Sequence, residues 1–241
     1  LLVIIIIITI TLLEHLRDAL STKAKRRHTM ATKIQKPFAV KGINITSPKG
    51  KALWCKFKEP DTKFNAKGEY STDLVLDPRD PTVKAYVAKL VEIVDIAYNE
   101  TCETVGQPKA REVRKASVYK EEYDQNGEPT GNIIIKYKLK DIADRKERGD
   151  TTEIVVVDAK KNTLGKDAPL VGNGSVVRLI SYANPYYMAS TKTVGISHIW
   201  SKMQLIDLVE FSGGGDGFDD EDGFEADQTI GNNSFDDEDD F

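Results

Sequence analysis

Hydrophobic and polar residues alternate along much of this chain, in short runs that predict β-strands. Residues 69–76, EYSTDLVL, form one such run, and Asp77-Pro78 ends it. The sequence QNGEPTGN at 125–132 predicts a hairpin turn between two other runs. Strands are expected at 38–45, 51–58, 69–76, 117–123, 132–139, 153–159, 175–183 and 197–211.

One segment has helical periodicity instead. Asp80 is the expected N-cap, Pro81 suits the first turn, and Gly106 ends the segment. Many short strands with one helix predict a small closed barrel or a sandwich. The helix follows the third predicted strand, which favours the OB-fold, a barrel that commonly inserts a helix between its third and fourth strands. The helix residues expected to face the core are Val83, Val87, Leu90, Val91, Val94 and Tyr98.

Two predicted strands carry rows of lysines on one face, because side chains alternate between the two faces of a strand. In the strand at 132–139 and the residue after it, the lysines at 136, 138 and 140 face away from Ile133, Ile135, Tyr137 and Leu139. In the strand at 51–58, one predicted face carries Leu53, Cys55 and Phe57, and the opposite face carries Trp54, Lys56 and Lys58. An exposed tryptophan on a lysine face requires an explanation.

Charge divides the chain into a basic body and an acidic tail. Of the 38 Asp and Glu residues, twelve lie after Phe211, where Lys and Arg are absent; with 34 Lys and Arg, residues 1–211 carry a net charge of +8. The linker SGGGDG and the residues after it cannot form a core, so 212–241 is predicted to be a disordered acidic tail. The predicted domain is 30–211.

The first 29 residues do not resemble a domain. LLVIIIIITITLL has thirteen uncharged residues, fewer than the roughly 20 that a membrane-spanning helix needs. It also lacks the preceding basic region and the cleavage site of a signal peptide. Met30 opens MATKIQKPF, which resembles a natural start. The favoured interpretation is a non-native upstream extension at 1–29; a membrane anchor is the alternative.

Catalysis is not predicted. The sequence shows no nucleophile–base set in a recognisable context, no phosphate-binding glycine motif, and no metal-ligand spacing among Cys55, Cys102 and the three histidines. Two cysteines in a chain of this length are expected to be reduced and structural. We therefore expect a protein that is not an enzyme and has no metal and no cofactor.

Binding of single-stranded nucleic acid fits the residues better. Such binders combine aromatic rings, on which bases stack, with Lys and Arg for phosphates. Three stretches interleave the two kinds: WCKFK at 54–58, KYKLK at 136–140 and RLISYANPYY at 178–187. The alternative is that the lysine rows are ordinary solvated faces of an acidic-tailed interaction adaptor that binds no DNA. The candidate contacts in these stretches are Trp54, Lys56, Lys136, Lys138, Arg178, Tyr182 and Tyr186.

The last residues suggest a role for the tail. An acidic run that ends in an aromatic ring can imitate both the phosphates and a stacked base of DNA, and so compete for a basic groove. Once DNA displaces it, the tail could bind basic partner proteins through its ring. The alternative is that the tail only improves solubility. The partner-binding candidates are Asp236, Asp237, Glu238, Asp239, Asp240 and Phe241.

These residues resemble the single-stranded DNA-binding protein family of teseptimavirus-like podophages from Met30 to Phe241. The resemblance rests on IVVVDAKKNTLGKDAPLVGNGSVVRLISYANPY at 154–186, followed by MQLIDLVEF, the glycine linker and the acidic tail closing on Phe; GEYSTDLVLDPRDP followed by the helix also matches the family's order. It implies a mainly β fold, a five-stranded OB-fold barrel with extra strands and one inserted helix. This sequence departs from the family at 59–68, and its tail is shorter and carries additional Phe residues.

The resemblance also implies a function. Members coat and anneal single strands in phage DNA replication, recombination and repair, in the cytoplasm of the infected bacterial host. They form homodimers and contact the phage DNA polymerase and helicase-primase through the tail, where Phe241 falls. The positions that match the family's DNA-binding residues are Lys109, Arg111, Arg114, Lys115, Lys136, Lys138, Tyr182 and Tyr186.

Overall fold

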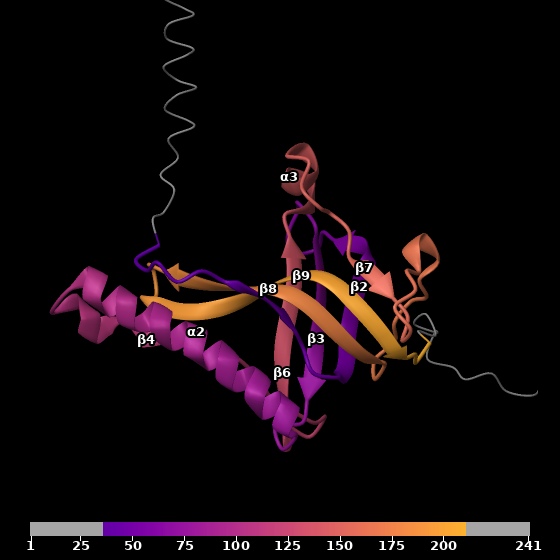
Figure 1. The fold of residues 1–241 in the computed structure, drawn as a ribbon, viewed down its shortest axis with the longest axis horizontal. Helices are drawn as coiled ribbons and strands as arrows, with labels where there is room; N and C mark the ends of the chain where they lie inside the picture. Colours follow the sequence, from indigo (N-terminus) through magenta and orange to yellow (C-terminus); the bar gives the residue numbers. More distant parts are fainter. Residues whose placement is uncertain (1–35, 211–241) are drawn as a thin grey trace, which may run out of the picture.

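A computed structural model describes residues 36–210 of the chain (Figure 1). The predicted extension at 1–29 and the predicted acidic tail at 212–241, with its partner-binding candidates, lie outside the described residues and stay predictions. Between residues 36 and 210, no helix has the length and hydrophobicity needed to cross a membrane.

Each predicted strand has a counterpart, at the predicted bounds for 69–76 and with shifted ends for the others, and the long helix forms as expected. The strands are β1 (Ile43–Thr46), β2 (Gly50–Asp61), β3 (Glu69–Leu76), β4 (Arg114–Lys115), β5 (Lys120–Tyr123), β6 (Pro129–Lys140), β7 (Val155–Val157), β8 (Val176–Met188) and β9 (Thr193–Asp207). The helices are α2 (Pro81–Val105), α3 (Ile142–Glu147) and the 3-10 turns η1 (Lys109–Glu112) and η2 (Gly165–Asp167). The sequence did not predict β4, α3, η1 or η2.

Five of the strands close a barrel. Each pairs with the next in the order β8, β2, β3, β6, β9 and back to β8. The β6–β9 pair is parallel and the other four pairs are antiparallel. β2 and β8 meet through two residue pairs, Gly50–Val177 and Lys51–Val176, so the ring is partly open there. The predicted OB-fold barrel with extra strands is confirmed.

The position of the helix in the barrel differs from the expectation. α2 does follow the third strand of the chain, but β1 pairs with β8 outside the ring. α2 therefore joins the second and third strands of the ring, β3 and β6, and crosses obliquely below the hairpin of β8 and β9 (Figure 1). The short helix α3 and strand β7 lie between the third and fourth barrel strands.

The start of α2 confirms the predicted cap. The Asp80 carboxylate accepts a hydrogen bond from the backbone N–H of Thr82 at 2.7 Å. The predicted buried face was partly wrong, because Val91 is 39% exposed and Tyr86 is buried. A tyrosine can be buried here because its hydroxyl lies 2.8 Å from that of Tyr137 and forms a hydrogen bond with it. The buried helix residues are Val83, Tyr86, Leu90, Ile93, Val94, Ala97 and Thr101.

A β-bulge in β2 also changes a predicted face. Leu53 pairs with Asp73 of β3, and Lys56 pairs with Ser71, so Trp54 and Cys55 together oppose the single residue Thr72. Leu53 therefore lies on the outer face with Lys56, whereas the prediction placed it inside with Cys55. Trp54 is the extruded residue, with a φ of 52°. Period-2 alternation cannot anticipate an inserted residue.

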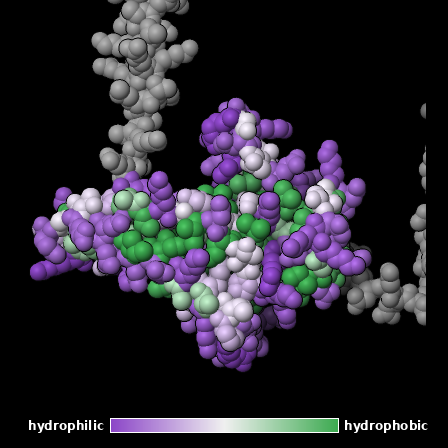
Figure 2. Space-filling model, in the orientation of Figure 1, coloured by the Kyte–Doolittle hydropathy of each residue, from purple (hydrophilic) through white to green (hydrophobic). Residues whose placement is uncertain are grey.

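Two hydrophobic clusters hold these elements. The larger fills the barrel, with Trp200, Tyr137 and Leu74 fully buried, and includes the inner face of α2. The smaller joins α2 to the β8–β9 hairpin and residues 38–40, around Val94 and Val194. In Figure 2 the hydrophobic residues form a band across the middle of the molecule, where α2 and the hairpin cross. Cys55 and Cys102 are free thiols, and burial raises the pKa of Cys55 to about 12.

His198 makes the stability of the barrel sensitive to pH. It is 6% exposed, its Nδ1 lies 3.0 Å from Ser181 Oγ, and its ring lies 4.7 Å from that of Tyr137. Burial lowers the pKa of His198 from 6.5 to about 4. The unfolded chain therefore takes up this proton first as the pH falls. The free energy of unfolding should drop by about 2 kcal/mol between pH 7 and pH 5 because of this residue.

Urea unfolding at both pH values measures this effect. His198→Gln removes the titrating group, so its unfolding free energy should change less across the same interval than that of the original protein. Equal pH dependence in the two proteins would contradict the assignment.

Candidate nucleic-acid interface

A groove of about 480 Å³ runs between β6, α3 and the β8–β9 hairpin. Its charge is strongly basic, because five cationic side chains and one carboxylate line it. This combination is suited to a phosphate backbone. The lining residues are Lys136, Lys138, Lys140, Asp141, Arg145, Arg148, Tyr186, Ile196, Ser197, His198 and Ile199.

The strand β6 supplies the lysines of the groove. Its alternation is the predicted one, since Ile133, Ile135, Tyr137 and Leu139 are all buried. The opposite face therefore carries the lysines at 136, 138 and 140 outward, at intervals of two residues. Two of these, Lys136 and Lys138, are predicted DNA contacts, and the structure brings them into one groove with Tyr186.

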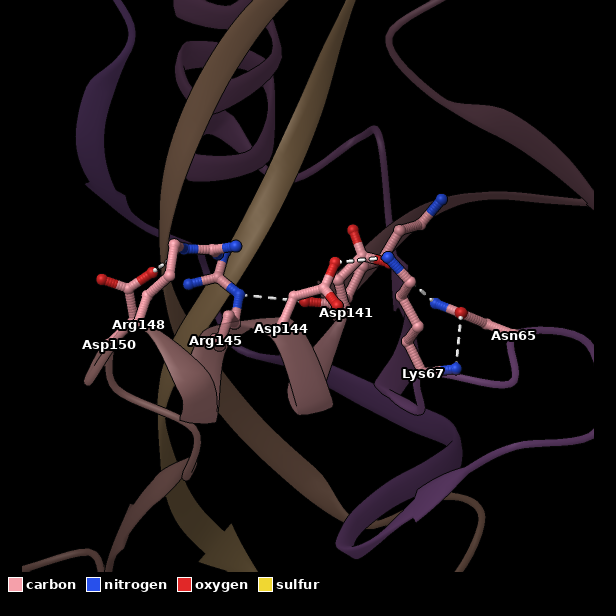
Figure 3. A network of polar contacts seen from close by, with 8 residues as sticks. Asn65, Lys67, Asp141, Asp144, Arg145, Arg148 and Asp150 are labelled. Atoms are coloured by element: carbon pink, nitrogen blue, oxygen red, sulfur yellow. Dashed lines mark hydrogen bonds and ion pairs between the residues drawn. The ribbon is translucent and has the colours of Figure 1, made fainter. Parts of the chain in front are cut away.

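The short helix α3 supplies Arg145, its C-cap residue is Arg148, and the loop between β2 and β3 holds the helix in place (Figure 3). Lys67 Nζ lies 2.5 Å from the carboxylate of Asp144, and Asn65 Nδ2 donates to Asp141 at 3.2 Å. Arg145 Nε donates to the backbone carbonyl of Lys140 at 2.9 Å. These contacts fix the end of β6 and α3 relative to each other.

Sequence reasoning missed three of the five cations, Lys140, Arg145 and Arg148. Lys140 was assigned to the lysine row but not chosen as a contact. The signal for the arginines was the run DRKER at 144–148, directly after the lysine strand. Arg148 pairs with Asp150 at 3.0 Å, whereas Arg145 makes no ion pair within residues 36–210.

The two predicted tyrosines have different surroundings. Tyr186 lies across Gly195 of β9, where an added Cβ would come within 2.6 Å of its hydroxyl oxygen. This residue lines the groove. Tyr182 instead packs over Gly42, with ring atoms 2.8 Å from where a Cβ would stand, and it is not among the lining residues of the groove. The structure thus brings one of the two rings to the lysine row.

The four predicted basic contacts between α2 and β5, at positions 109, 111, 114 and 115, also have different surroundings. Arg114 pairs with Thr193 of β9, so it shares the outer face of the hairpin with Tyr186. Lys115 points to α2, where its Nζ lies 2.8 Å from Asp95 and 5.1 Å from the centre of the Tyr98 ring. The hydrogen bond with Asp95 raises the pKa of Lys115. Lys109 and Arg111 lie on η1, exposed and outside the groove lining.

The remaining predicted contacts lie at different distances from the groove. Lys56 is on the same outer face as Lys138, because both pair with Ser71. Trp54 is 69% exposed at the bulge, and its backbone N–H donates to the Asn173 side chain at 2.8 Å. Arg178 is eight residues from Tyr186 along β8, roughly 26 Å at ~3.3 Å per residue. The structure therefore does not bring it to the groove.

Phe64 is an aromatic residue that the sequence reasoning did not select. It lies in the loop between β2 and β3 and is 89% exposed, with Lys63 Nζ 5.5 Å from the ring centre. This loop joins the first two strands of the barrel, and OB-folds use the loop at that position to bind oligonucleotides. The same loop contacts α3 through Asn65 and Lys67, so Phe64 belongs to the element that borders the groove.

A larger hollow of about 760 Å³ lies between residues 36–39 and the end of α2. Glu100 and Glu103 line it together with Lys36. Glu100 already accepts hydrogen bonds from the backbone N–H groups of Ala39 and Val40, at 2.6 and 3.0 Å. Its charge does not favour phosphate, so the smaller, basic groove is the better candidate for the nucleic-acid interface.

Known proteins match this chain. The family described as the single-stranded DNA-binding protein of bacteriophage T7 matches residues 49–210. The single-stranded DNA-binding protein of Enterobacteria phage T3 is 26% identical over 159 residues, which are 63% of this chain and 67% of that protein. Its counterpart in Escherichia phage T7 is 27% identical over 164 residues, 65% and 69% of the two chains.

A solved structure supports the fold. The crystal structure of the single-stranded DNA-binding protein encoded by bacteriophage T7 aligns with a TM-score of 0.56 at 22% identity, over 77% of this chain and 100% of that one. The matching family consists of binding proteins and not enzymes, as the sequence predicted. The matched residues 49–210 contain the whole barrel and the groove. This chain therefore belongs to the single-stranded DNA-binding protein family of bacteriophage T7.

Proposed function

We propose that this protein binds single-stranded DNA without chemical catalysis, along the groove of β6, α3 and the β8–β9 hairpin. The observation that carries the proposal is the gathering of five cationic side chains and Tyr186 in one groove, on a barrel of this family. The lysines and arginines neutralise successive phosphates, and Tyr186 and Phe64 offer faces for unpaired bases. A duplex keeps its bases stacked inside, so it cannot use these rings.

Membership of the family also suggests a biological role. Coating and annealing of single strands in phage DNA replication, recombination and repair is the role that we propose, in the cytoplasm of the infected bacterial host. Membership of the family and the basic groove support it. We propose further that the protein acts as a homodimer and that residues 236–241 recruit the phage DNA polymerase and helicase-primase.

The acidic tail also competes with DNA in this proposal. The sequence after Phe211 contains twelve Asp and Glu residues, which would compete with phosphates for the five cations of the groove, and the ring of Phe241 would substitute for a stacked base. Removing 212–241 should therefore tighten DNA binding and abolish polymerase contact. Weaker DNA binding after removal would contradict the competition.

Anisotropy of a labelled, unstructured oligonucleotide tests the proposed function. Single strand should bind more tightly than duplex of the same length. The slope of log affinity against log salt should be negative and no steeper than about −3.5, because each of the five groove cations can contribute up to about −0.7. Absence of binding to any nucleic acid would favour the interaction adaptor. Quenching of tryptophan fluorescence, chiefly from the exposed Trp54, provides a second readout.

A further inference from the structure

Carboxylates lie within the lysine face of the barrel. Register places three rows across β2, β3 and β6, and partners in a row point to the same side of the sheet. Two of the rows join a β3 carboxylate to a β6 lysine. The rows are Leu53–Asp73–Lys136, Lys56–Ser71–Lys138 and Asp61–Glu69–Lys140.

These carboxylates are paired with the lysines proposed to bind phosphate. Glu69 contacts a lysine of the neighbouring row, since its Oε1 lies 2.5 Å from Lys138 Nζ. Asp73 contacts the lysine of its own row, since its Oδ1 lies 3.5 Å from Lys136 Nζ. The second contact is an ion pair without a hydrogen bond, since Asp73 Oδ1 has no hydrogen-bond partner among residues 36–210. The charge of Asp73 therefore acts mainly on Lys136 and on any anion that approaches it.

The side chains of the two carboxylates are also less exposed than those of the two lysines. The side chains of Glu69 and Asp73 are 15% and 22% exposed, against 29% for Lys138 and 53% for Lys136. A phosphate that approaches from solvent thus has easier access to the lysine than to the more buried carboxylate that is paired with it. Binding exchanges one anionic partner of the lysine for another, and the displaced carboxylate then repels the phosphate.

We propose that Glu69 and Asp73 are internal competitors of the DNA phosphates, which weaken binding and so keep a bound strand exchangeable. This inference rests on the proposed function. Because the two carboxylates neutralise part of the lysine row before DNA arrives, fewer counterions are released on binding and the salt dependence is shallower.

The test uses neutral isosteres in the full chain. Glu69→Gln and Asp73→Asn should each tighten binding of a labelled oligonucleotide by roughly three- to tenfold at low salt. Each should also steepen the log–log salt slope by up to about 0.7, because more of the charge of its lysine becomes available to a phosphate. Asp77→Asn is the matched control: it removes one carboxylate paired with Arg79, outside the groove, and should change affinity less than twofold.

A further variant tests the same face with the opposite change in charge. Ser71→Glu adds a carboxylate between Lys56 and Lys138 and should weaken binding by a similar factor. The inference would be overturned if both isosteres left binding unchanged or weakened it, or if Asp77→Asn gave an equal gain. In that case, binding of single-stranded DNA by the wild-type protein would still uphold the proposed function. A wild-type protein that binds no single strand would instead contradict the proposed function itself.

Discussion

Reversing the charge of Lys136 and Lys138 together should weaken binding of single-stranded DNA by roughly 100-fold at low salt. Each Lys→Glu change removes a cation from the groove and adds an anion in its place, so a phosphate contact becomes a repulsion. Glu69 and Asp73 then add to that repulsion, because their lysine partners are gone. The salt slope should become less negative by less than about 1.4, because each lysine can contribute at most about 0.7 and its carboxylate partner already offsets part of that. Anisotropy titrations across salt concentrations measure both quantities.

The control for this double change is Lys84→Glu with Lys89→Glu. Both residues are exposed on α2 and outside the groove lining, and the change in net charge is the same. At about 0.1 M salt this pair should alter affinity by less than about threefold, because exposed charges beyond a Debye length of about 10 Å are then largely screened. Equal losses in the two double variants would show that only net charge matters, and would argue against the groove as the binding site.

Replacing Tyr186 by alanine should weaken single-strand binding by about 5- to 150-fold, which corresponds to the loss of one base-stacking contact of roughly 1–3 kcal/mol. Tyr186→Phe should retain most of the affinity, because stacking requires the ring and not the hydroxyl. The free energy of unfolding should change little for Tyr186→Phe. Titration with an unstructured oligonucleotide, with urea unfolding beside it, separates binding from stability.

Tyr182→Ala is the matched comparison on the same strand. Its ring covers Gly42 and is absent from the groove lining, so we expect loss of stability by about 1–3 kcal/mol with DNA affinity within about threefold. If Tyr182→Ala weakened DNA binding as much as Tyr186→Ala, the DNA path would cross β8 farther from α3 than the groove indicates.

The sequence by itself determined the elements and one face of the site. Alternation in β6 is strict, with four buried apolar side chains and three outward lysines, because a strand that closes a barrel must bury one face completely. The cap at Asp80 and the long helix are equally local, since the side chain and the N–H that it accepts from are two residues apart. The charge asymmetry between body and tail is also a property of sequence alone.

Only the tertiary structure decided which charged and aromatic residues meet. The bulge at Trp54 moved Leu53 to the outer face, and no local pattern encodes that inserted residue. Arg145 and Arg148 joined Lys136 because the β2–β3 loop fixes α3 at the end of β6, through contacts between residues almost 80 positions apart. Tyr186 and Tyr182 are the same residue type on the same strand, so the sequence does not distinguish their surroundings. Their neighbours Gly195 and Gly42, brought by pairing of distant strands, placed one ring in the groove and packed the other against the backbone.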